Sequence, residues 1–108
     1  GHLGGLWEFP GGKCRAGERH EHAVVRECRE ELGIEVRVLA KLAEVRHAYT
    51  HFKIVLHVFA CRLRGRLPRS AAPHAWVEFS ELQNYPFPAA NHKFFPQLQV
   101  WLSNYRDE

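Results

Sequence analysis

Three glutamates crowded into the stretch RECREELG, residues 26–33, limit what this chain can fold into more than any other feature. In a helix, side chains three and four residues apart lie on one face, so Glu27, Glu30 and Glu31 would face one another. Each like-charge pair at this spacing destabilises a helix by about 0.2–0.5 kcal/mol. The helix dipole also disfavours anions in the last turns. We therefore expect a cation to sit among these carboxylates.

The residues around the glutamates have the pattern of a helix. Over residues 18–32, apolar side chains recur at helical spacing and gather on one side, at Val24, Val25, Cys28 and Leu32. Gly33 follows, and glycine is the residue that most often ends a helix in the left-handed conformation. The sequence therefore predicts a helix over 18–32 that ends at Gly33.

Two strand-like segments follow this helix. Residues 35–46 alternate in part, with apolar side chains on one side. Residues 51–63 are apolar on both faces, as expected of a strand that is buried on each side. We expect the apolar side chains of the second segment to lie in the core, at Phe52, Ile54, Leu56 and Val58.

Shorter elements are expected towards the C-terminus. Residues 75–79 predict a strand that places Trp76 in the core, and Ser80 is a good N-cap for a helical turn after it. An apolar stripe predicts a last helix over 91–103. Pro96 lies within it, so this helix should start or kink near Pro96, because proline fits the first turn of a helix but not its interior.

Together these elements predict an α+β fold, in which a mixed β-sheet lies between the glutamate-bearing helix and the C-terminal helix. A chain of 108 residues suits one domain with a modest core, spanning 1–108. No apolar run approaches the roughly 18 residues that cross a bilayer, so no membrane partner is expected.

The cysteines and the net charge indicate the cellular location of the chain and the class of its partners. Cys14, Cys28 and Cys61 are odd in number and scattered, and no signal peptide is evident, which favours reduced thiols and a cytoplasmic location. The formal charge of +3 favours anionic partners such as nucleotides or nucleic acid, although a mildly basic solvated surface explains it equally well.

The glutamates and the loop before them are suited to a metal and a phosphate. Mg²⁺ and Mn²⁺ prefer oxygen ligands and usually bind a few carboxylates together with substrate phosphates. The loop FPGGK, residues 9–13, supplies glycine backbone that can approach such groups closely, and Lys13 adds a positive charge. The stretch therefore predicts a metal-assisted site for a phosphorylated substrate.

The same residues resemble the signature of the Nudix hydrolase family, in which glycine, glutamate, an Arg-Glu pair, a Glu-Glu pair and a final glycine follow at set spacings. The fixed positions are all present, with cysteine as an unusual apolar choice at one of them. They are Gly12, Glu18, Arg26, Glu27, Cys28, Glu30, Glu31, Gly33 and Ile34.

This resemblance implies a Nudix fold and hydrolysis of a nucleoside diphosphate linked to another group. It implies Mg²⁺, or Mn²⁺, held by Glu27, Glu30 and Glu31 with the backbone carbonyl of Gly11. Glu27 and Glu30 are then expected to be catalytic, with Glu27 as a base for water in some members, while other members recruit a base from a loop.

The remaining residues of the signature have supporting roles in the family. Arg26 is expected to be part of the catalytic set with Glu27 and Glu30, by holding a catalytic carboxylate in place. Glu18 is expected to be a structural or outer partner, and Gly12 and Gly33 to shape the loop and the helix end.

Two segments outside the signature resemble the MutT-like branch, which removes oxidised nucleotides. They are residues 5–13, GLWEFPGGK, and 85–93, YPFPAANHK. The resemblance implies that Asn91 reads an oxidised guanine, since an amide offers both a donor and an acceptor to a purine edge. Lys13 and Phe87 are expected to contact the substrate, a nucleoside triphosphate such as 8-oxo-dGTP. Alternatively, Asn91 is a helix N-cap.

A rival interpretation comes from the C-terminal domain of the adenine glycosylase MutY, which reads 8-oxoguanine in duplex DNA. Residues 49–51, Tyr-Thr-His, resemble a motif of that domain. Residues 67–76 contain no acid, although MutT-type enzymes often carry a glutamate there. The chain also starts at the GLWEFPGG loop, where the family usually has an earlier strand, so we expect an N-terminally truncated domain. The complete set of glutamates favours catalysis, and the oligomeric state stays open.

Overall fold

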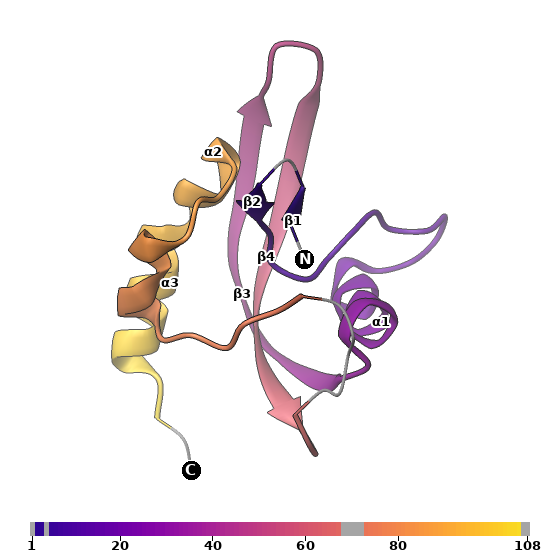
Figure 1. Ribbon diagram of the computed structural model, residues 1–108. Coiled ribbons are helices and arrows are strands. Elements are labelled where there is room, and N and C mark those ends of the chain that lie inside the picture. The colour runs from indigo at the N-terminus through magenta and orange to yellow at the C-terminus, as the bar shows by residue number, and fades with distance from the viewer. Residues whose placement is uncertain (1, 4, 68–72, 107–108) are drawn as a thin grey trace.

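The computed structural model describes residues 2–3, 5–67 and 73–106 (Figure 1). The elements follow in the order β1 (His2–Leu3), β2 (Leu6–Trp7), α1 (His20–Leu32), β3 (Glu35–Ala48), β4 (Lys53–Arg64), the 3₁₀ helix η1 (Phe79–Asn84), α2 (Ala89–His92) and α3 (Phe95–Asn104). The α+β class is confirmed. None of the helices among the described residues is both long and apolar enough to cross a membrane.

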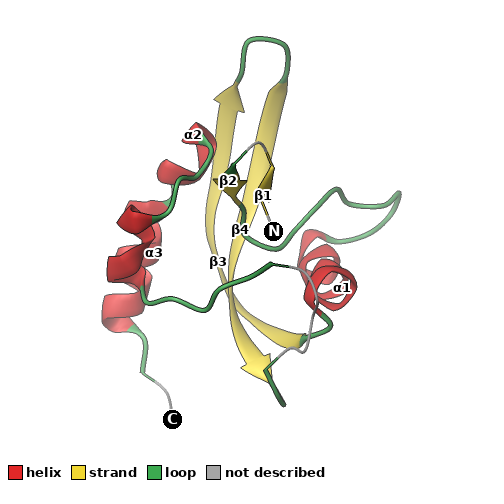
Figure 2. Ribbon diagram, in the orientation of Figure 1, coloured by secondary structure: helices red, strands yellow, loops and turns green. Residues whose placement is uncertain are grey.

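The long hairpin β3–β4 is the centre of the molecule. Figure 2 shows α1 on one side of it and α2 with α3 on the other, which confirms the predicted sandwich. The two strands pair antiparallel from Glu35 opposite Arg64 to Ala48 opposite Lys53, with register shifts near Val38 and Lys41. The sequence predicts a mixed sheet, but in the part of the chain described here every strand pair is antiparallel, in the two sheets β1–β2 and β3–β4.

Helix α1 packs on the open end of the hairpin through the apolar side that the sequence predicts. Buried Cys28, Ile34 and Val36 form a cluster, against which lie the partly buried side chains of Val24, Val25, Leu32, Cys61 and Leu63. The helix begins at His20, two residues after the predicted start, and Gly33 ends it with φ 65°. This packing fixes the direction in which the glutamates of α1 point.

Aromatic contacts join the other helical layer to the N-terminal loop. Phe94 is 3% exposed, and its ring lies 5.4 Å from that of Phe9. The backbone N–H of Trp7 donates to the carbonyl of Pro86 at 2.7 Å, and the Trp7 ring meets Tyr85 edge-on. The segment that carries the loop 9–13 is therefore anchored to the segment that leads into α2.

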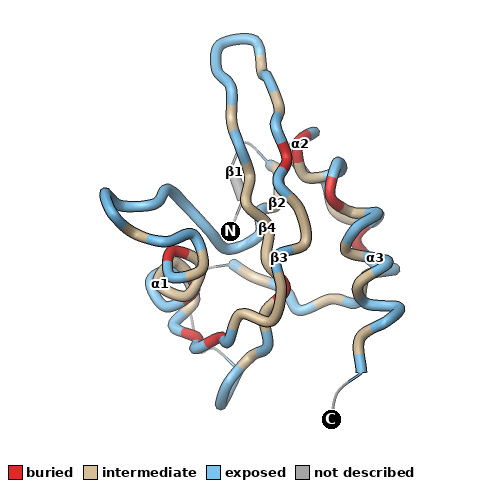
Figure 3. The backbone as a smooth tube through the Cα atoms, turned by 180° about the vertical axis from the view of Figure 1, so that it is seen from behind, coloured by how far each residue is buried: buried red, intermediate tan, exposed pale blue. Residues whose placement is uncertain are grey.

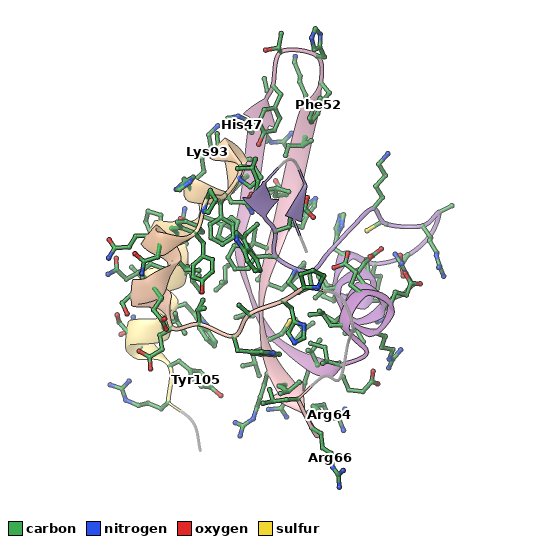
Figure 4. All side chains as sticks on the ribbon, in the orientation of Figure 1. His47, Phe52, Arg64, Arg66, Lys93 and Tyr105 are labelled. Carbon is green, nitrogen blue, oxygen red and sulfur yellow. The ribbon has the colours of Figure 1, made fainter. Side chains whose placement is uncertain are left out.

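Three predictions from the sequence are wrong. Residues 75–79 form no strand, and Trp76 is 54% exposed. Ser80 does not cap the following turn, because Glu78 and Glu81 form a reciprocal capping box instead. Phe52 is 57% exposed, since it lies at the tip of the hairpin beyond the helices (Figure 4).

The predicted C-terminal helix is divided into α2 and α3. Pro96 lies in the first turn of α3, as the sequence predicts, and this position explains the break between the two helices. Figure 3 shows that the buried positions are limited to short stretches where helices meet the hairpin, so individual core contacts carry much of the packing.

The two layers give a direct test of packing. We expect Phe94→Ala to lower the free energy of unfolding by about 3–5 kcal/mol, because it removes a buried ring. The matched change Phe52→Ala should cost about 0.5 kcal/mol or less, because that ring is largely in solvent. Urea denaturation measures both, and equal losses would contradict this placement of the two rings.

Candidate active site

The loop before α1 approaches the helix most closely at Gly12. A Cβ atom on Gly12 would lie 2.6 Å from Glu27 Oε1, whereas a Cβ on Gly11 would meet nothing within 4 Å. The Glu27 carboxylate therefore fills the space that a side chain at position 12 would need. This contact explains why glycine is required at that position, for a packing reason and not for a special φ angle.

Arg26 connects the carboxylates of the site. Its Nε donates to Glu18 Oε2 at 2.8 Å, and its Nη1 donates to Glu27 Oε1 at 2.9 Å and to Glu30 Oε2 at 3.1 Å. Its Nη2 donates to Glu18 Oε1 at 2.9 Å and to the carbonyl of Lys13 at 3.0 Å. With its side chain only 16% exposed, Arg26 fixes both the loop and the helix.

Glu18 holds the other end of this network. Its Oε1 also accepts from the backbone N–H of Arg15 at 2.9 Å. The hydrogen bonds from Arg26 and then from the Arg15 backbone lower the pKa of Glu18 from 4.5 to about 2. The guanidinium of Arg15 lies 3.0 Å from Glu30 Oε1, so Glu30 has a second cationic partner that the sequence analysis did not foresee.

Glu31 is in a different electrostatic environment. Its Oε2 accepts from the backbone N–H of Gly11 at 3.3 Å. Burial raises the pKa of Glu31, and the nearby charges of Glu27 and Glu8 raise it further, against the lowering by the Gly11 hydrogen bond. Glu31 is therefore a carboxylate whose charge is disfavoured by desolvation and by neighbouring carboxylates, which a cation would relieve.

The residues present fit a divalent metal in chemistry, although no group of three or more acidic, histidine or cysteine side chains among the described residues is arranged so that it could hold a metal ion. Glu27 and Glu31 supply hard oxygen donors, and Gly12 leaves room for the first of them. Glu30 is turned towards Arg15 and Arg26. Its expected part in a metal site would require it to leave these two partners.

Phe87 lies just before α2, and Asn91 lies within it. The loop 9–13 contacts this layer through Phe9. The Phe87 ring stacks on that of Phe9, with centroids 5.1 Å apart, next to the glycines of the loop. Asn91 is inside α2, and its N–H donates to the carbonyl of Pro88 at 3.0 Å. The alternative role of Asn91 as a helix N-cap is wrong, because Pro88 occupies the cap. Among the described hydrogen bonds, none joins Asn91 to the carboxylates of α1.

Two groups near the site were missed by the sequence analysis. Cys14 Sγ lies 3.1 Å from His20 Nδ1, and the His20 ring stacks on His57 of β4 at 3.6 Å. In the second group, His47 Nδ1 is the buried side-chain atom without a partner among the described residues, and Figure 4 places His47 beside Lys93. The packing of α1 on β4, and of the segment after α2 on β3, brings these residues together, and no local pattern signals them.

Comparison with known proteins identifies the family. The profile described as "NUDIX domain" matches residues 1–97. An 8-oxo-dGTP diphosphatase of Proteus vulgaris is 45% identical over 58 residues, which are 54% of this chain and 52% of that protein. The 8-oxo-dGTP diphosphatase of Escherichia coli (strain K12) is 30% identical over 100 residues, covering 91% of this chain and 78% of that protein.

Other similar proteins are not named 8-oxo-dGTP diphosphatases. The adenine DNA glycosylase of Rattus norvegicus is 32% identical over 99 residues, which are 88% of this chain but only 19% of that protein. Among solved structures, the solution structure of the E. coli ORF135 protein matches with a TM-score of 0.77 and 31% identity, covering 95% of this chain and 76% of that one. The chain thus spans about half of the Proteus protein, at 52%, and about a fifth of the glycosylase, at 19%.

The contact between Gly12 and Glu27 predicts opposite effects for two neighbouring substitutions. We expect Gly12→Ala to destabilise by about 1–3 kcal/mol, because the new methyl group displaces a carboxylate that Arg26 holds. The control Gly11→Ala should be neutral or stabilising by about 0.4–1 kcal/mol. In a Glu27→Ala background the cost of Gly12→Ala should disappear. Urea denaturation of all the variants measures this, and a cost that persists would contradict the contact.

The lowered pKa of Glu18 predicts a dependence of stability on pH. A carboxyl group whose pKa is lowered on folding stabilises the protein above its unfolded pKa, and this stabilisation is lost as the pH falls to the folded value. The difference in unfolding free energy between wild type and Glu18→Gln should therefore be largest above about pH 5 and shrink towards pH 2, where the folded pKa lies. Denaturation across this range tests it, with Glu21→Gln, in the first turn of the same helix, as control. A constant difference would contradict the network.

Proposed function

Because the chain belongs to the Nudix hydrolase family, we propose that it hydrolyses a nucleoside triphosphate to the monophosphate and pyrophosphate, with an oxidised purine nucleotide such as 8-oxo-dGTP as substrate. The single observation that carries this proposal is the Glu27 carboxylate, which is held by Arg26 against the glycine loop. The family profile over residues 1–97 and the relatives named 8-oxo-dGTP diphosphatase support it.

Glu27, Glu30, Glu31 and the carbonyl of Gly11 would hold Mg²⁺, or Mn²⁺. When bound, such an ion neutralises the charge that develops on a transferring phosphoryl group. The protein's own part is to fix the donors in place. Arg26 does so for Glu27 through a 2.9 Å hydrogen bond, while Gly11 does so for Glu31 through its N–H.

The chain's residues also suit the other tasks of the reaction. Glu27 is our candidate base for the attacking water, since its side chain is 15% exposed and its carboxylate keeps one oxygen that Arg26 does not bind. Lys13 is exposed at the loop and offers positive charge to the phosphates. Phe87, which stacks on Phe9 of the loop, and Asn91 would bind the base.

A second candidate function is recognition of 8-oxoguanine in duplex DNA, as part of an adenine glycosylase. The observation that favours it is the tip of the β3–β4 hairpin, where Thr50, His51 and Phe52 are exposed. The match to the rat glycosylase over 88% of this chain supports the same alternative. The acid-free segment 67–76 bears on both candidates, and its residues 68–72 lie outside the described part of the chain.

Pyrophosphate release from a panel of normal and oxidised nucleoside triphosphates with Mg²⁺ distinguishes the two functions. We expect release to favour 8-oxo-dGTP and to fall about 10²- to 10⁴-fold in Glu27→Gln, which removes the base and a metal ligand. Glu21→Gln, on the same helix but outside the site, is the matched control and should keep full activity.

The other outcomes have distinct meanings. Release that prefers a different nucleotide would keep the hydrolase and overturn the role of Asn91 in reading oxidised guanine. Absence of release from every nucleotide, together with tight binding to duplex DNA that carries 8-oxoguanine, would replace the hydrolase with the lesion-recognition function.

A further inference from the structure

The open end of the β3–β4 hairpin carries a group of arginines that the proposed hydrolysis does not use. Arg37 on β3 and Arg62 on β4 are directly opposite one another in the sheet register. Arg64 follows Arg62 by two residues, so its side chain leaves the same face of the strand. All three residues are exposed, and together they form what we call the arginine patch, Arg37, Arg62 and Arg64.

The arginine patch lies on the face of the hairpin opposite α1. The neighbours Cys61 and Leu63 pack against the apolar cluster of α1, and side chains alternate between faces along a strand. Arg62 Nη1 donates to the hydroxyl of Tyr105, which directly follows α3, at 3.3 Å. The patch is therefore separated from the carboxylates of α1 by the thickness of the sheet.

Two members of the arginine patch, Arg37 and Arg64, make no ion pair with another described residue. Glu35 lies opposite Arg64, but its carboxylate is bound by Arg29 at 2.9 Å, and that hydrogen bond is the main cause of its lowered pKa. Within the described residues, neither Arg37 nor Arg64 has a carboxylate within ion-pair distance.

The surface at the arginine patch is hollowed. A shallow depression of about 450 Å³ is lined by Arg37, Arg62, Leu63 and Arg64. Figure 4 places Arg64 at this end of the hairpin, with Arg66 next to it and Tyr105 towards the chain end. The ring of Tyr105, half-buried, stacks on Trp101 at 4.6 Å. The basic depression thus has one aromatic residue, Tyr105, bonded to its lining at Arg62.

We propose that the arginine patch binds the phosphate backbone of a single-stranded nucleic acid. Guanidinium groups bind phosphate oxygens with two parallel hydrogen bonds and stay charged at every physiological pH. The depression is open, so it suits a nucleic-acid strand that runs across it better than a small molecule that binds in an enclosed pocket. Aromatic side chains beside a basic groove give bases a surface on which to stack, and this combination is how proteins bind single strands without reading their sequence.

Binding of a fluorescent oligothymidine of about a dozen nucleotides, followed by anisotropy at several salt concentrations, tests the proposal. The variant Arg37→Gln/Arg64→Gln removes two charges from the patch. Since each phosphate contact on a single strand contributes about 0.7 to the salt slope, the slope should fall by about 1.4. Between about 50 and 200 mM salt, wild type should lose about sevenfold more affinity than the variant.

A control variant with the same change in net charge separates binding at the arginine patch from general electrostatic attraction. Arg19→Gln/Arg46→Gln removes two exposed arginines elsewhere and should bind as tightly as wild type. Equal losses in both double variants would overturn the patch as a site. Displacement of the oligonucleotide by inorganic phosphate or by a free nucleotide at the same phosphate concentration would overturn the nucleic-acid partner in favour of a small anion. Displacement by polyglutamate alone would overturn it in favour of an acidic protein.

Two further measurements separate a loss of oligonucleotide binding from misfolding and from a loss of the proposed hydrolysis. Thermal unfolding and nucleotide hydrolysis of Arg37→Gln/Arg64→Gln should match those of wild type, because the patch and the α1 carboxylates are on opposite faces. A variant that folds, hydrolyses and still binds the oligonucleotide with the wild-type salt slope would contradict the proposal.

Discussion

The guanidinium of Arg26 is the interaction on which the rest of the site depends. It donates to three glutamates and to the backbone of the loop, so one side chain joins α1 to the segment ahead of it. Like-charged glutamates on a helix repel one another, and the half-buried guanidinium of Arg26 relieves that repulsion between Glu27 and Glu30. The helix can therefore fold with these glutamates in place.

Much of this site could be predicted from residues close in sequence. The spacing of Glu27, Glu30 and Glu31 on a helix, and Gly33 at its end, depend on local geometry alone. The contact of Gly12 with Glu27 and the pairing of Arg15 with Glu30 were not predicted, because they depend on how the loop folds back over the helix. The metal ligands and the base-reading role of Asn91 stay predictions.

The errors in the fold have a common physical cause. Apolar sequence patterns predicted a buried Phe52 and a strand at 75–79, but a pattern cannot tell whether a partner surface exists. Phe52 extends past both helical layers, while the segment before η1 finds a reciprocal capping box instead of a strand partner. Where a partner did exist, as for Cys28 against Ile34 and Val36, the pattern was right.

The central claim is that the carboxylates around Arg26 form a metal site, and thermal unfolding with and without Mg²⁺ tests it most directly. A ligand that binds only the folded state stabilises it, by about 2.7 kcal/mol at a hundredfold excess over Kd. We predict that Mg²⁺ raises the melting temperature of wild type and of Glu21→Gln but not of Glu27→Gln or Glu31→Gln. An equal rise in all four proteins, or no rise in wild type, would contradict the claim.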